Sequence, residues 1–443
     1  MRDANGKNMN ISIIGLGKLG LCTAACIASK GVKVYGFDIN TDLMHKLKNK
    51  ECPINETGLI ELLEKAWSNF IVADTVQETI QKTDATLIIT PTPSDSSGKF
   101  ENHYITDVLK KIAPFIKTKN SFHIVDIVST VMPGSCENEF IPLLENMTGK
   151  IAGKDFGIAY NPEFIALGSV IKNFLNPDIV LIGASDDYTL NYIKNLYLTV
   201  CENNPHIAEM SLINAEITKL SLNCYVTMKI SYANELASIC EKVPGADVDA
   251  VTSAIGLDTR IGQKCLKAGL GFGGPCFPRD NAAFQQFAKK YYAETKLSKQ
   301  VVSINNDTIT RLYGLIEANV SRNAHIAVLG AAYKPFTHII EESPSIHLID
   351  KLLAVGHTLS VHDPQALEWT KNKYAEKLKY HDDVNECIIN AEAVVIMTSW
   401  PEYEKIDFAP FDDDIKILID PWRLYKNNLF KNIKYFALGA CHA

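Results

Sequence analysis

The cysteine at position 276 lies in a segment whose composition suits covalent chemistry. The segment reads Gly-Phe-Gly-Gly-Pro-Cys-Phe-Pro-Arg-Asp and ends at Asp280, and four glycines between 269 and 274 let backbone approach a ligand closely. A helix is predicted to begin near Pro278. A helix N-terminus and the nearby Arg279 both favour a reactive thiolate. Cys276 is therefore the candidate nucleophile, whereas the other ten of the eleven cysteines are interpreted as core residues.

A lysine and an asparagine stand four residues apart in a segment with helical spacing. Lys219 and Asn223 leave the same face of such a helix, because positions i and i+4 are neighbours on its surface. A cation and an amide donor together suit stabilisation of an alkoxide or a tetrahedral oxyanion. The alternative interpretation is a partly exposed lysine beside a packing asparagine.

Two further polar residues follow predicted strands. Thr130 belongs to Ser-Thr-Val-Met-Pro-Gly (129–134), and Glu163 belongs to Asn-Pro-Glu-Phe (161–164). At strand ends of a doubly wound domain, such side chains face the cofactor edge and can position a water or assist proton transfer. Ordinary turn residues remain the alternative.

A glycine-rich turn near the start of the chain predicts a dinucleotide site. In Gly15-x-Gly17-x-x-Gly20 the glycines permit a tight turn, close approach to a pyrophosphate and close helix packing. Asp38 ends the next strand, where a carboxylate binds ribose hydroxyls and repels a 2′-phosphate. The predicted cofactor is therefore NAD rather than NADP. A Rossmann-like unit without a ligand is the alternative.

The elements that position these residues form an α/β fold. Residues 11–38 read as strand, glycine turn, helix and strand, and apolar runs recur at 86–90, 122–128 and 178–183 with helical patterns between them. This alternation predicts a mainly parallel, doubly wound sheet. A stretch from Glu209 to Glu241 contains neither Gly nor Pro and predicts one long helix.

A second α/β unit follows the helical region. It starts at HIAVLGAAYKP (325–335), and later strands are predicted at 358–363, 393–399 and 415–420. We therefore expect two Rossmann-like domains, 1–208 and 306–443, joined by a central helical domain at 209–305. The second unit has Gly330-Ala331-Ala332-Tyr333 in place of the glycine fingerprint, so we expect no second dinucleotide there. Lys334 can meet a phosphate at this sheet edge or be an ordinary solvated lysine.

Composition limits the class of protein and its partners. A chain of 443 residues is expected to form more than one domain, and its net charge of −7 argues against nucleic-acid binding. Neither an apolar run of membrane-spanning length nor a signal-peptide pattern is visible. Scattered cysteines without a C-x-x-C pair suit a reducing compartment. We expect a cytoplasmic protein without a membrane or metal partner.

These segments, in their order, give the sequence a resemblance to the UDP-glucose/GDP-mannose dehydrogenase family over nearly the whole chain. The segments that carry it are GLGKLG (15–20), PTP (91–93), STVMPG (129–134), NPEF (161–164), EITKLSLNCYVTMKISYANEL (216–236), DTRIG (258–262), GLGFGGPCFPRD (269–280), YKP (333–335) and AEAVVIMTSWPEY (391–403). The resemblance implies oxidation of a nucleotide-sugar CH₂OH to a carboxylate with two NAD⁺, through a thiohemiacetal and a thioester on Cys276.

The resemblance also implies roles for individual residues. Lys219 and Asn223 would meet the developing oxyanion, and Asp280, Thr130 and Glu163 would organise acid–base steps and the hydrolytic water. Cofactor contacts are expected from Gly15, Gly17, Lys18, Leu19, Gly20, Asp38, Pro91, Thr92 and Thr130. Substrate contacts are expected from Glu163, Phe164, Lys219, Arg260, Gly273, Tyr333 and Lys334. Arg260 would reach the substrate of a neighbouring subunit, so a homodimer or a higher homo-oligomer built on the long helix is expected.

Three departures from the family pattern concern the substrate. Leu167 stands where a Glu is common. The usual D-D-x-R-x-S-P after YKP becomes His-Ile-Ile-Glu-Glu-Ser-Pro (338–344), and the common D-G-R becomes Asp-Pro-Trp-Arg (420–423). These departures therefore affect the identity of the sugar more than the class of reaction. UDP-glucose is the first choice, and a UDP-N-acetylhexosamine or GDP-mannose is the alternative. A nucleotide-sugar binding protein without turnover would require a broken nucleophile or cofactor loop, and a two-electron alcohol dehydrogenase would not need the cysteine.

Overall fold

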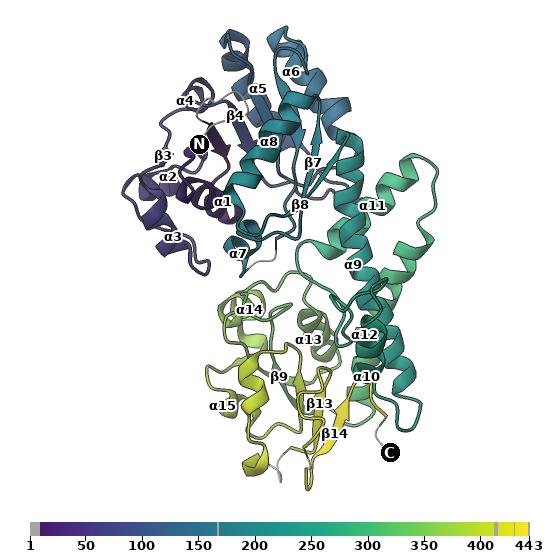
Figure 1. The fold of residues 1–443 in the computed structure, drawn as a ribbon. Helices are drawn as coiled ribbons and strands as arrows, with labels where there is room; N and C mark the ends of the chain where they lie inside the picture. Colours follow the sequence, from purple (N-terminus) through teal and green to yellow (C-terminus); the bar gives the residue numbers. More distant parts are fainter. Residues whose placement is uncertain (1–8, 166–167, 412–414, 429, 442–443) are drawn as a thin grey trace. The chain divides into compact units, whose positions relative to one another are not determined.

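The structure is a computed structural model that describes residues 9–165, 168–411, 415–428 and 430–441. The chain divides into two compact units, the first ending at Ser221 and the second beginning at Leu222. Each unit contains one sheet with helices on its faces (Figure 1).

The first unit is built on an eight-stranded sheet in the order β3-β2-β1-β4-β5-β6-β7-β8. The strands from β1 to β6 are parallel, whereas β7 runs antiparallel to β6 and β8 is parallel to β7. Their bounds are β1 Asn10–Ile14, β2 Lys33–Phe37, β3 Phe70–Val72, β4 Ala85–Ile88, β5 Ile124–Ile127, β6 Gly157–Tyr160, β7 Ile179–Ala184 and β8 His206–Met210.

Helices cover both faces of this sheet, which is why its strands are apolar on both sides. Ile11 and Ile13 pack into one core, while Ile14 belongs to the other. The helices are α1 Lys18–Ser29, α2 Thr41–Lys48, α3 Leu59–Ala66, α4 Val76–Gln81, α5 His103–Thr118, α6 Ile141–Thr148, α7 Val170–Leu175 and α8 Asp187–Val200. A π-helical turn, Cys136–Phe140, precedes α6.

The second unit has a six-stranded, wholly parallel sheet in the order β11-β10-β9-β12-β13-β14. The strands are β9 His325–Leu329, β10 Thr358–His362, β11 Lys379–Tyr380, β12 Ala393–Ile396, β13 Ile417–Asp420 and β14 Lys434–Ala437. Its helices are α10 Val248–Gly256, α11 Phe277–Lys290, α12 Lys296–Glu317, α13 Pro344–Ala354, α14 Leu367–Tyr374 and α15 Val384–Ile388. Alternate residues of β9 enter two cores, one on each face of the sheet.

One long helix, α9 (Leu212–Cys240), contains the division between the units (Figure 1). One side of it carries buried polar residues, namely Glu216, Lys219, Asn223, Thr227, Ser231 and Asn234. Steps of three or four residues put these positions on one side of a helix. Each makes a hydrogen bond to a neighbouring loop or helix. Polar contacts thus fasten this side of α9, while Ala215, Ala233 and Ala237 of the same helix belong to apolar cores.

The predicted fold class is confirmed: two Rossmann-like parallel sheets with a helical region between them in the chain. The prediction that the long helix begins at Glu209 was wrong by three residues. Glu209 and Met210 belong to β8, because they pair with β7, and the Ser211 carbonyl accepts the first helical hydrogen bond, from the amide of Ala215 at 3.0 Å. Within the described part of the chain, no helix combines the length and apolarity that crossing a membrane requires.

Candidate functional site

The carboxyl ends of four neighbouring parallel strands gather predicted site residues at one edge of the first sheet. The strands β1, β4, β5 and β6 are adjacent and point the same way, so the segments after them start at the same edge. These segments contain Gly15 to Gly20, Pro91 and Thr92, Thr130, and Glu163 with Phe164. This is where ligands bind in open α/β sheets.

The glycine turn after β1 fits a dinucleotide. A Cβ on Gly15 would lie 2.2 Å from the Ile89 carbonyl oxygen, and one on Gly20 would lie 1.9 Å from that of Gly15. By contrast, no described atom lies within 4 Å of a Cβ built on Gly17. Gly15 and Gly20 are thus required by packing, whereas Gly17 leaves open space beside the N-terminus of α1, where amides favour a pyrophosphate. Lys18 and Leu19 are the first residues of this helix.

Asp38 follows β2 and folds back onto the glycine turn. Its Oδ2 accepts from the Leu16 amide at 2.7 Å, and its Oδ1 accepts from the Asn40 amide at 2.8 Å. The carboxylate is half-buried and fixed in direction. An oriented carboxylate at this position suits ribose hydroxyls and disfavours a 2′-phosphate.

The segments after β4 and β5 are tied to each other. The Thr92 hydroxyl donates to the Thr130 carbonyl at 2.7 Å, and the Ser129 hydroxyl both accepts from the Thr90 amide and donates to its carbonyl. Pro91 is exposed and Thr130 is half-buried. Both predicted cofactor segments therefore form one hydrogen-bonded rim beside the glycine turn.

Lys219 is almost fully buried against the segment that follows β6. Its ammonium donates to the Glu163 carbonyl and lies 4.4 Å from the centroid of the Phe164 ring. One turn earlier on α9, Glu216 accepts from the amides of Gly134 at 2.5 Å and Cys136 at 2.9 Å. The start of α9 thus fastens the segments after both β5 and β6. It also brings Lys219 into contact with Glu163 and Phe164, and all three were predicted to contact the substrate.

The Glu163 side chain turns toward α8. Its Oε1 accepts from the Tyr197 hydroxyl at 2.6 Å. Burial raises the pKa of Glu163 to about 7, although the Tyr197 hydrogen bond and the Lys219 charge act in the opposite direction. A carboxyl group with a pKa near neutrality can both take and give a proton at physiological pH.

In the second unit, Cys276 is the N-cap of α11 and is exposed. Its carbonyl accepts from the Asp280 amide at 2.8 Å, one turn into the helix. The Asp280 carboxylate is buried and accepts from Asn223 of α9 at 2.5 Å. The structure therefore brings three predicted catalytic residues together, with Cys276 and Asp280 on one face of α11.

The glycines before Cys276 are required by their neighbours. A Cβ on Gly269 would lie 2.5 Å from the Trp422 ring, one on Gly271 2.1 Å from Asn305, and one on Gly273 2.2 Å from the Glu342 carbonyl oxygen. Asn305 of α12 also accepts from the Phe272 amide at 2.7 Å and donates to its carbonyl at 3.0 Å. Close backbone packing thus fixes the loop that presents the thiol.

Tyr333 and Lys334 follow β9 and lie near this loop. A Cβ on Gly274 would lie 2.6 Å from the Tyr333 ring, and the Lys334 ammonium is 5.7 Å from the centroid of that ring. Burial, followed by the charge of Cys276, raises the pKa of Tyr333 to about 12. Gly273, Tyr333 and Cys276 therefore share one region of the second unit.

A buried carboxylate closes the turn after β9. Asp363, after β10, is buried and accepts from the amides of Ala331 at 2.8 Å and Ala332 at 3.0 Å. It also accepts from the Trp400 indole at 3.3 Å. Asp363 is therefore enclosed by donors of its own chain, whereas Asp38 is half-buried.

The remaining predicted substrate residue, Arg260, lies apart from these contacts. Its guanidinium is 87% exposed and pairs with Asp258 at 2.6 Å. Of the departures from the family pattern, His338 stacks on Trp369 with ring centroids 4.2 Å apart, and Ile340 packs on the core. Leu167 lies outside the described residues.

Arg423 is committed to a structural contact. The guanidinium donates to Asp249 of α10 at 2.9 Å and 3.0 Å, and to the carbonyls of Ala268, Pro421 and Leu438 at 2.8 Å each. The side chain is only 3% exposed. These contacts occupy the guanidinium of Arg423, the arginine of the altered Asp-Pro-Trp-Arg segment.

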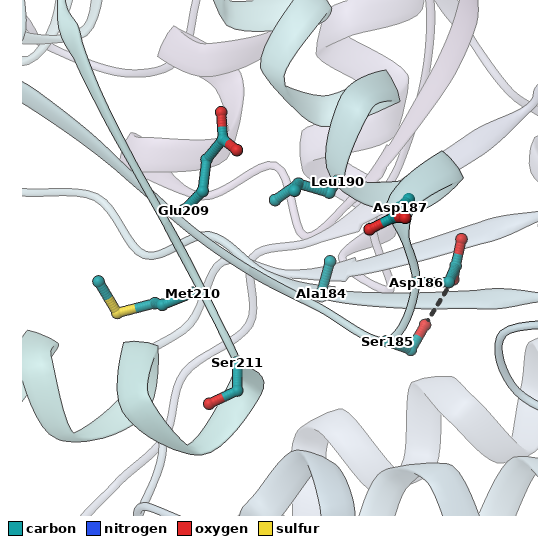
Figure 2. Close-up of a pocket in the computed structure, with 8 residues that line it drawn as sticks. All are labelled: Ala184, Ser185, Asp186, Asp187, Leu190, Glu209, Met210 and Ser211. Atoms are coloured by element: carbon teal, nitrogen blue, oxygen red, sulfur yellow. Dashed lines mark hydrogen bonds between the residues drawn. The ribbon is translucent and has the colours of Figure 1, made fainter.

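A hollow in the first unit lies away from the predicted site. It is lined by Ala184, Ser185, Asp186, Asp187, Leu190, Glu209, Met210 and Ser211 (Figure 2). Because β7 runs antiparallel to β6, its carboxyl end lies at the edge opposite the glycine turn. Asp186 caps α8, and Glu209 pairs with Lys194 at 2.6 Å, so the carboxylates there have structural contacts. Three carboxylates around the hollow also disfavour a phosphate.

Comparison with known proteins gives matches along the chain. The UDP-glucose/GDP-mannose dehydrogenase family matches in its NAD binding domain over residues 9–201, its central domain over 213–307 and its UDP binding domain over 327–427. The chain belongs to this family. The protein is thus an NAD-dependent nucleotide-sugar dehydrogenase, as its sequence predicted.

Individual relatives agree with the assignment. The chain is 35% identical to the UDP-glucose 6-dehydrogenase AglM of Haloferax volcanii, over 94% of this chain and 97% of the relative. A UDP-glucose dehydrogenase structure from Pyrobaculum islandicum has a TM-score of 0.87 and 31% identity over 98% of both chains. A UDP-D-ManNAc dehydrogenase structure from Pyrococcus horikoshii has a TM-score of 0.83 and 25% identity over 97% and 99% of the two chains.

Several partners of the site residues in this dehydrogenase were not predicted from the sequence. Tyr197 holds Glu163, Asn305 holds the glycine loop, and Glu56 forms an ion pair with Lys18. Tyr197 follows an apolar helical pattern that is also typical of a core residue, and Asn305 and Glu56 belong to no motif. They are identified only by their contacts with the predicted residues in the folded chain.

Proposed function

We propose that the protein oxidises UDP-glucose to UDP-glucuronate, reducing two NAD⁺ per sugar through covalent intermediates on Cys276. The observation that carries the proposal is the exposed Cys276 at the start of α11, with Asp280 and Asn223 hydrogen-bonded one turn away. A thiol that can hold the aldehyde product is needed only when a second oxidation follows the first.

The proposed reaction proceeds in three stages. In the first, the C6 alcohol loses a proton and a hydride to give an aldehyde. In the second, the Cys276 thiolate adds to the aldehyde carbon, and the resulting thiohemiacetal loses a second hydride to give a thioester. In the third, water adds to the thioester carbon and the thiolate leaves, giving the carboxylate. NAD⁺ supplies the acceptor for each hydride.

The chain's own residues support these stages. The Lys219 ammonium and the Asn223 amide stabilise negative charge that develops on the C6 oxygen, because fixed donors in a buried site need little reorganisation. Asp280 orients Asn223 through their hydrogen bond. Glu163 has a pKa raised to about 7 by burial, which suits a base that activates the hydrolytic water together with Thr130.

Substrate and cofactor contacts follow the predicted residues. The first unit would contact NAD through Gly15 to Gly20, Asp38, Pro91, Thr92 and Thr130. Phe164, Gly273, Tyr333 and Lys334 would contact the nucleotide sugar. We retain the division into an NAD-binding domain at 1–208, a central domain at 209–305 and a nucleotide-sugar domain at 306–443.

The sugar assignment has one specific competitor. UDP-N-acetylmannosamine is favoured by the similarity to the UDP-D-ManNAc dehydrogenase of Pyrococcus horikoshii and by the altered segment at 338–341. The higher identity to UDP-glucose dehydrogenases favours UDP-glucose. GDP-mannose is the third candidate.

A stoichiometric assay tests the proposal. Purified protein is given limiting UDP-glucose, UDP-N-acetylmannosamine, UDP-N-acetylglucosamine or GDP-mannose with excess NAD⁺, and NADH is counted per sugar consumed. We expect two NADH per UDP-glucose and the highest kcat/KM for that sugar. One NADH per sugar would contradict the thioester mechanism, and faster turnover of another sugar would contradict only the substrate.

We also propose a homo-oligomer built on α9 that is active in the reducing cytoplasm. Tyr225, Tyr232 and Ile239 recur every seven residues on α9 and are 57%, 49% and 52% exposed, which suits burial against a second copy. None of the eleven cysteines, all of which lie within the described residues, forms a disulfide, as is usual in reducing compartments. Arg260 would reach the partner's substrate. Light scattering that gives the mass of one chain would contradict the oligomer.

Removal of the Tyr197 hydroxyl is expected to change the pH profile. The Tyr197 hydrogen bond lowers the pKa of Glu163 against the larger effect of burial, so Tyr197→Phe raises that pKa further above its value of about 7. The acid limb of kcat should move to higher pH by roughly one to two units, since a hydrogen bond to a charged group contributes about 1.5–3 kcal/mol. Tyr188→Phe, on the same helix and 42% exposed, is the control. Identical profiles for both variants would argue against Glu163 as the base.

A further inference from the structure

An ion pair links the dinucleotide turn to a residue outside every predicted motif. The Lys18 ammonium lies 3.0 Å from Oε2 of Glu56, whose side chain is fully buried. Lys18 is the first residue of α1, beside the proposed pyrophosphate site, and is 28% exposed in its side chain. Glu56 precedes α3, which packs with α1 in the same core.

The same carboxylate also holds the segment beyond the predicted sugar residues. Its Oε1 accepts from the Val170 amide at 3.0 Å, and its Oε2 accepts from the Gly168 amide at 3.3 Å. Val170 is the first residue of α7 and follows Phe164 by six positions. Both oxygens of Glu56 are therefore used, one for α7 alone and the other for Lys18 and Gly168 together.

The loss of any one partner of the buried Glu56 carboxylate would have a large cost in free energy. Without Lys18, its charge would lie in the core with only two amides to compensate it. Without Glu56, the amides of Gly168 and Val170 would lose their acceptor, and Lys18 would lose its fixed direction. The position of Lys18 and the backbone at 168–170 are thus mutually dependent.

We propose that Lys18 and Glu56 form a positioning pair that couples NAD binding to nucleotide-sugar binding. A pyrophosphate at the start of α1 fixes the Lys18 ammonium, Lys18 fixes Glu56, and Glu56 fixes the backbone at Gly168 and Val170, which follow Glu163 and Phe164 in the chain. The inference rests on the proposed function, which gives Glu163 and Phe164 a role at the sugar. Because coupling is reciprocal, each ligand tightens the other by the same factor.

The coupling can be measured without turnover, because NADH cannot accept a hydride. Titration calorimetry gives the Kd of UDP-glucose with and without saturating NADH, and NADH fluorescence gives the Kd of NADH with and without UDP-glucose. In the native protein we expect each ligand to tighten the other by about fivefold or more, the lower end of usual coupling factors.

Three variants then separate coupling from direct binding. Glu56→Gln keeps the size and an acceptor oxygen, so NADH alone should bind within about threefold of native, while the coupling factor falls to about one. Lys18→Met should lose the coupling and also weaken NADH binding by about tenfold, as expected for a lost charge-assisted hydrogen bond. Lys30→Met, at the other end of α1 and paired with the exposed Glu202, is the control and should match native.

The outcomes distinguish this inference from the proposed function. Native-like coupling in a folded Glu56→Gln protein, or a native coupling factor of one, would overturn the positioning pair and leave the proposed function intact. If Glu56→Gln does not fold, retained coupling in Lys18→Met would overturn the pair in the same way. A native protein that binds NADH but not UDP-glucose would contradict the proposed substrate and, with it, the inference.

Discussion

Replacement of Cys276 by serine is expected to abolish carboxylate formation while NADH binding persists. A serine alkoxide is a far poorer leaving group than a thiolate, so an ester in place of the thioester would not be released at a useful rate. The expected loss in kcat is on the order of 10⁴–10⁶-fold, as when other enzymes lose a nucleophile. NADH titration measures cofactor binding, product analysis measures carboxylate formation, and rapid-mixing absorbance of NADH measures the rate of oxidation.

The structure offers a matched control for this variant. Cys265 is also exposed and lies in the same unit, but it has no part in the proposed reaction. Cys265→Ser should retain native turnover and two NADH per sugar. The Cys276→Ser protein should form at most one NADH per sugar, because the first oxidation does not require the thiol. Native stoichiometry and turnover in that protein would exclude the covalent role.

Features set by local backbone chemistry were predicted well from the sequence. Gly15 and Gly20 are needed because backbone oxygens occupy the space of their side chains, and a glycine pattern after an apolar strand records that need directly. The loops after β5 and β6 were predicted at the ligand edge, since parallel strands end at the same edge of a sheet. The parallel order of β1, β4, β5 and β6 confirms this arrangement.

Features that depend on distant partners were not predicted. Glu216, Thr227 and Asn234 are buried on α9, where apolar spacing alone would have indicated an apolar core. Their hydrogen bonds reach residues 80, 54 and 35 positions away in the chain. The hydroxyl that holds Glu163 is likewise 34 residues away. No local pattern encodes such pairs, so the sequence could suggest candidate site residues but not the residues that orient them.

Arg423 shows the same limit in a residue that the sequence did single out. The departure from the D-G-R pattern drew attention to Arg423, but nothing in the sequence indicated Asp249, 174 residues earlier, as its partner. The backbone of Arg423 has a φ of 62°, in the left-handed region that non-glycine residues rarely adopt. Five hydrogen bonds of the guanidinium offset the cost of that conformation.

Arg423→Met is therefore expected to destabilise the second unit more than any surface change. The substitution keeps an unbranched apolar side chain but leaves Asp249 without its bidentate partner and removes a donor from the carbonyls of Ala268, Pro421 and Leu438. The expected loss is about 3–5 kcal/mol. For a unit of this size the melting temperature should fall by roughly 6–20 °C, at about 2–4 °C per kcal/mol. Calorimetric unfolding measures the change.

The pH dependence of that loss distinguishes the ion pair from simple packing. Burial opposes ionisation of Asp249, but hydrogen bonds and the charge of Arg423 prevail and lower its pKa below the ordinary 3.8. A lowered folded-state pKa stabilises the protein above the unfolded value and ceases to do so as pH falls through the folded one. The difference in unfolding free energy between the native protein and Arg423→Met should thus be largest near pH 7 and shrink below about pH 4.

The matched control is Lys426→Met, which removes an exposed cation 3.4 Å from the same carboxylate and should change stability by less than about 1 kcal/mol. Equal losses in the two variants, or a loss independent of pH, would show that the buried guanidinium is not what joins α10 to the segment after β13.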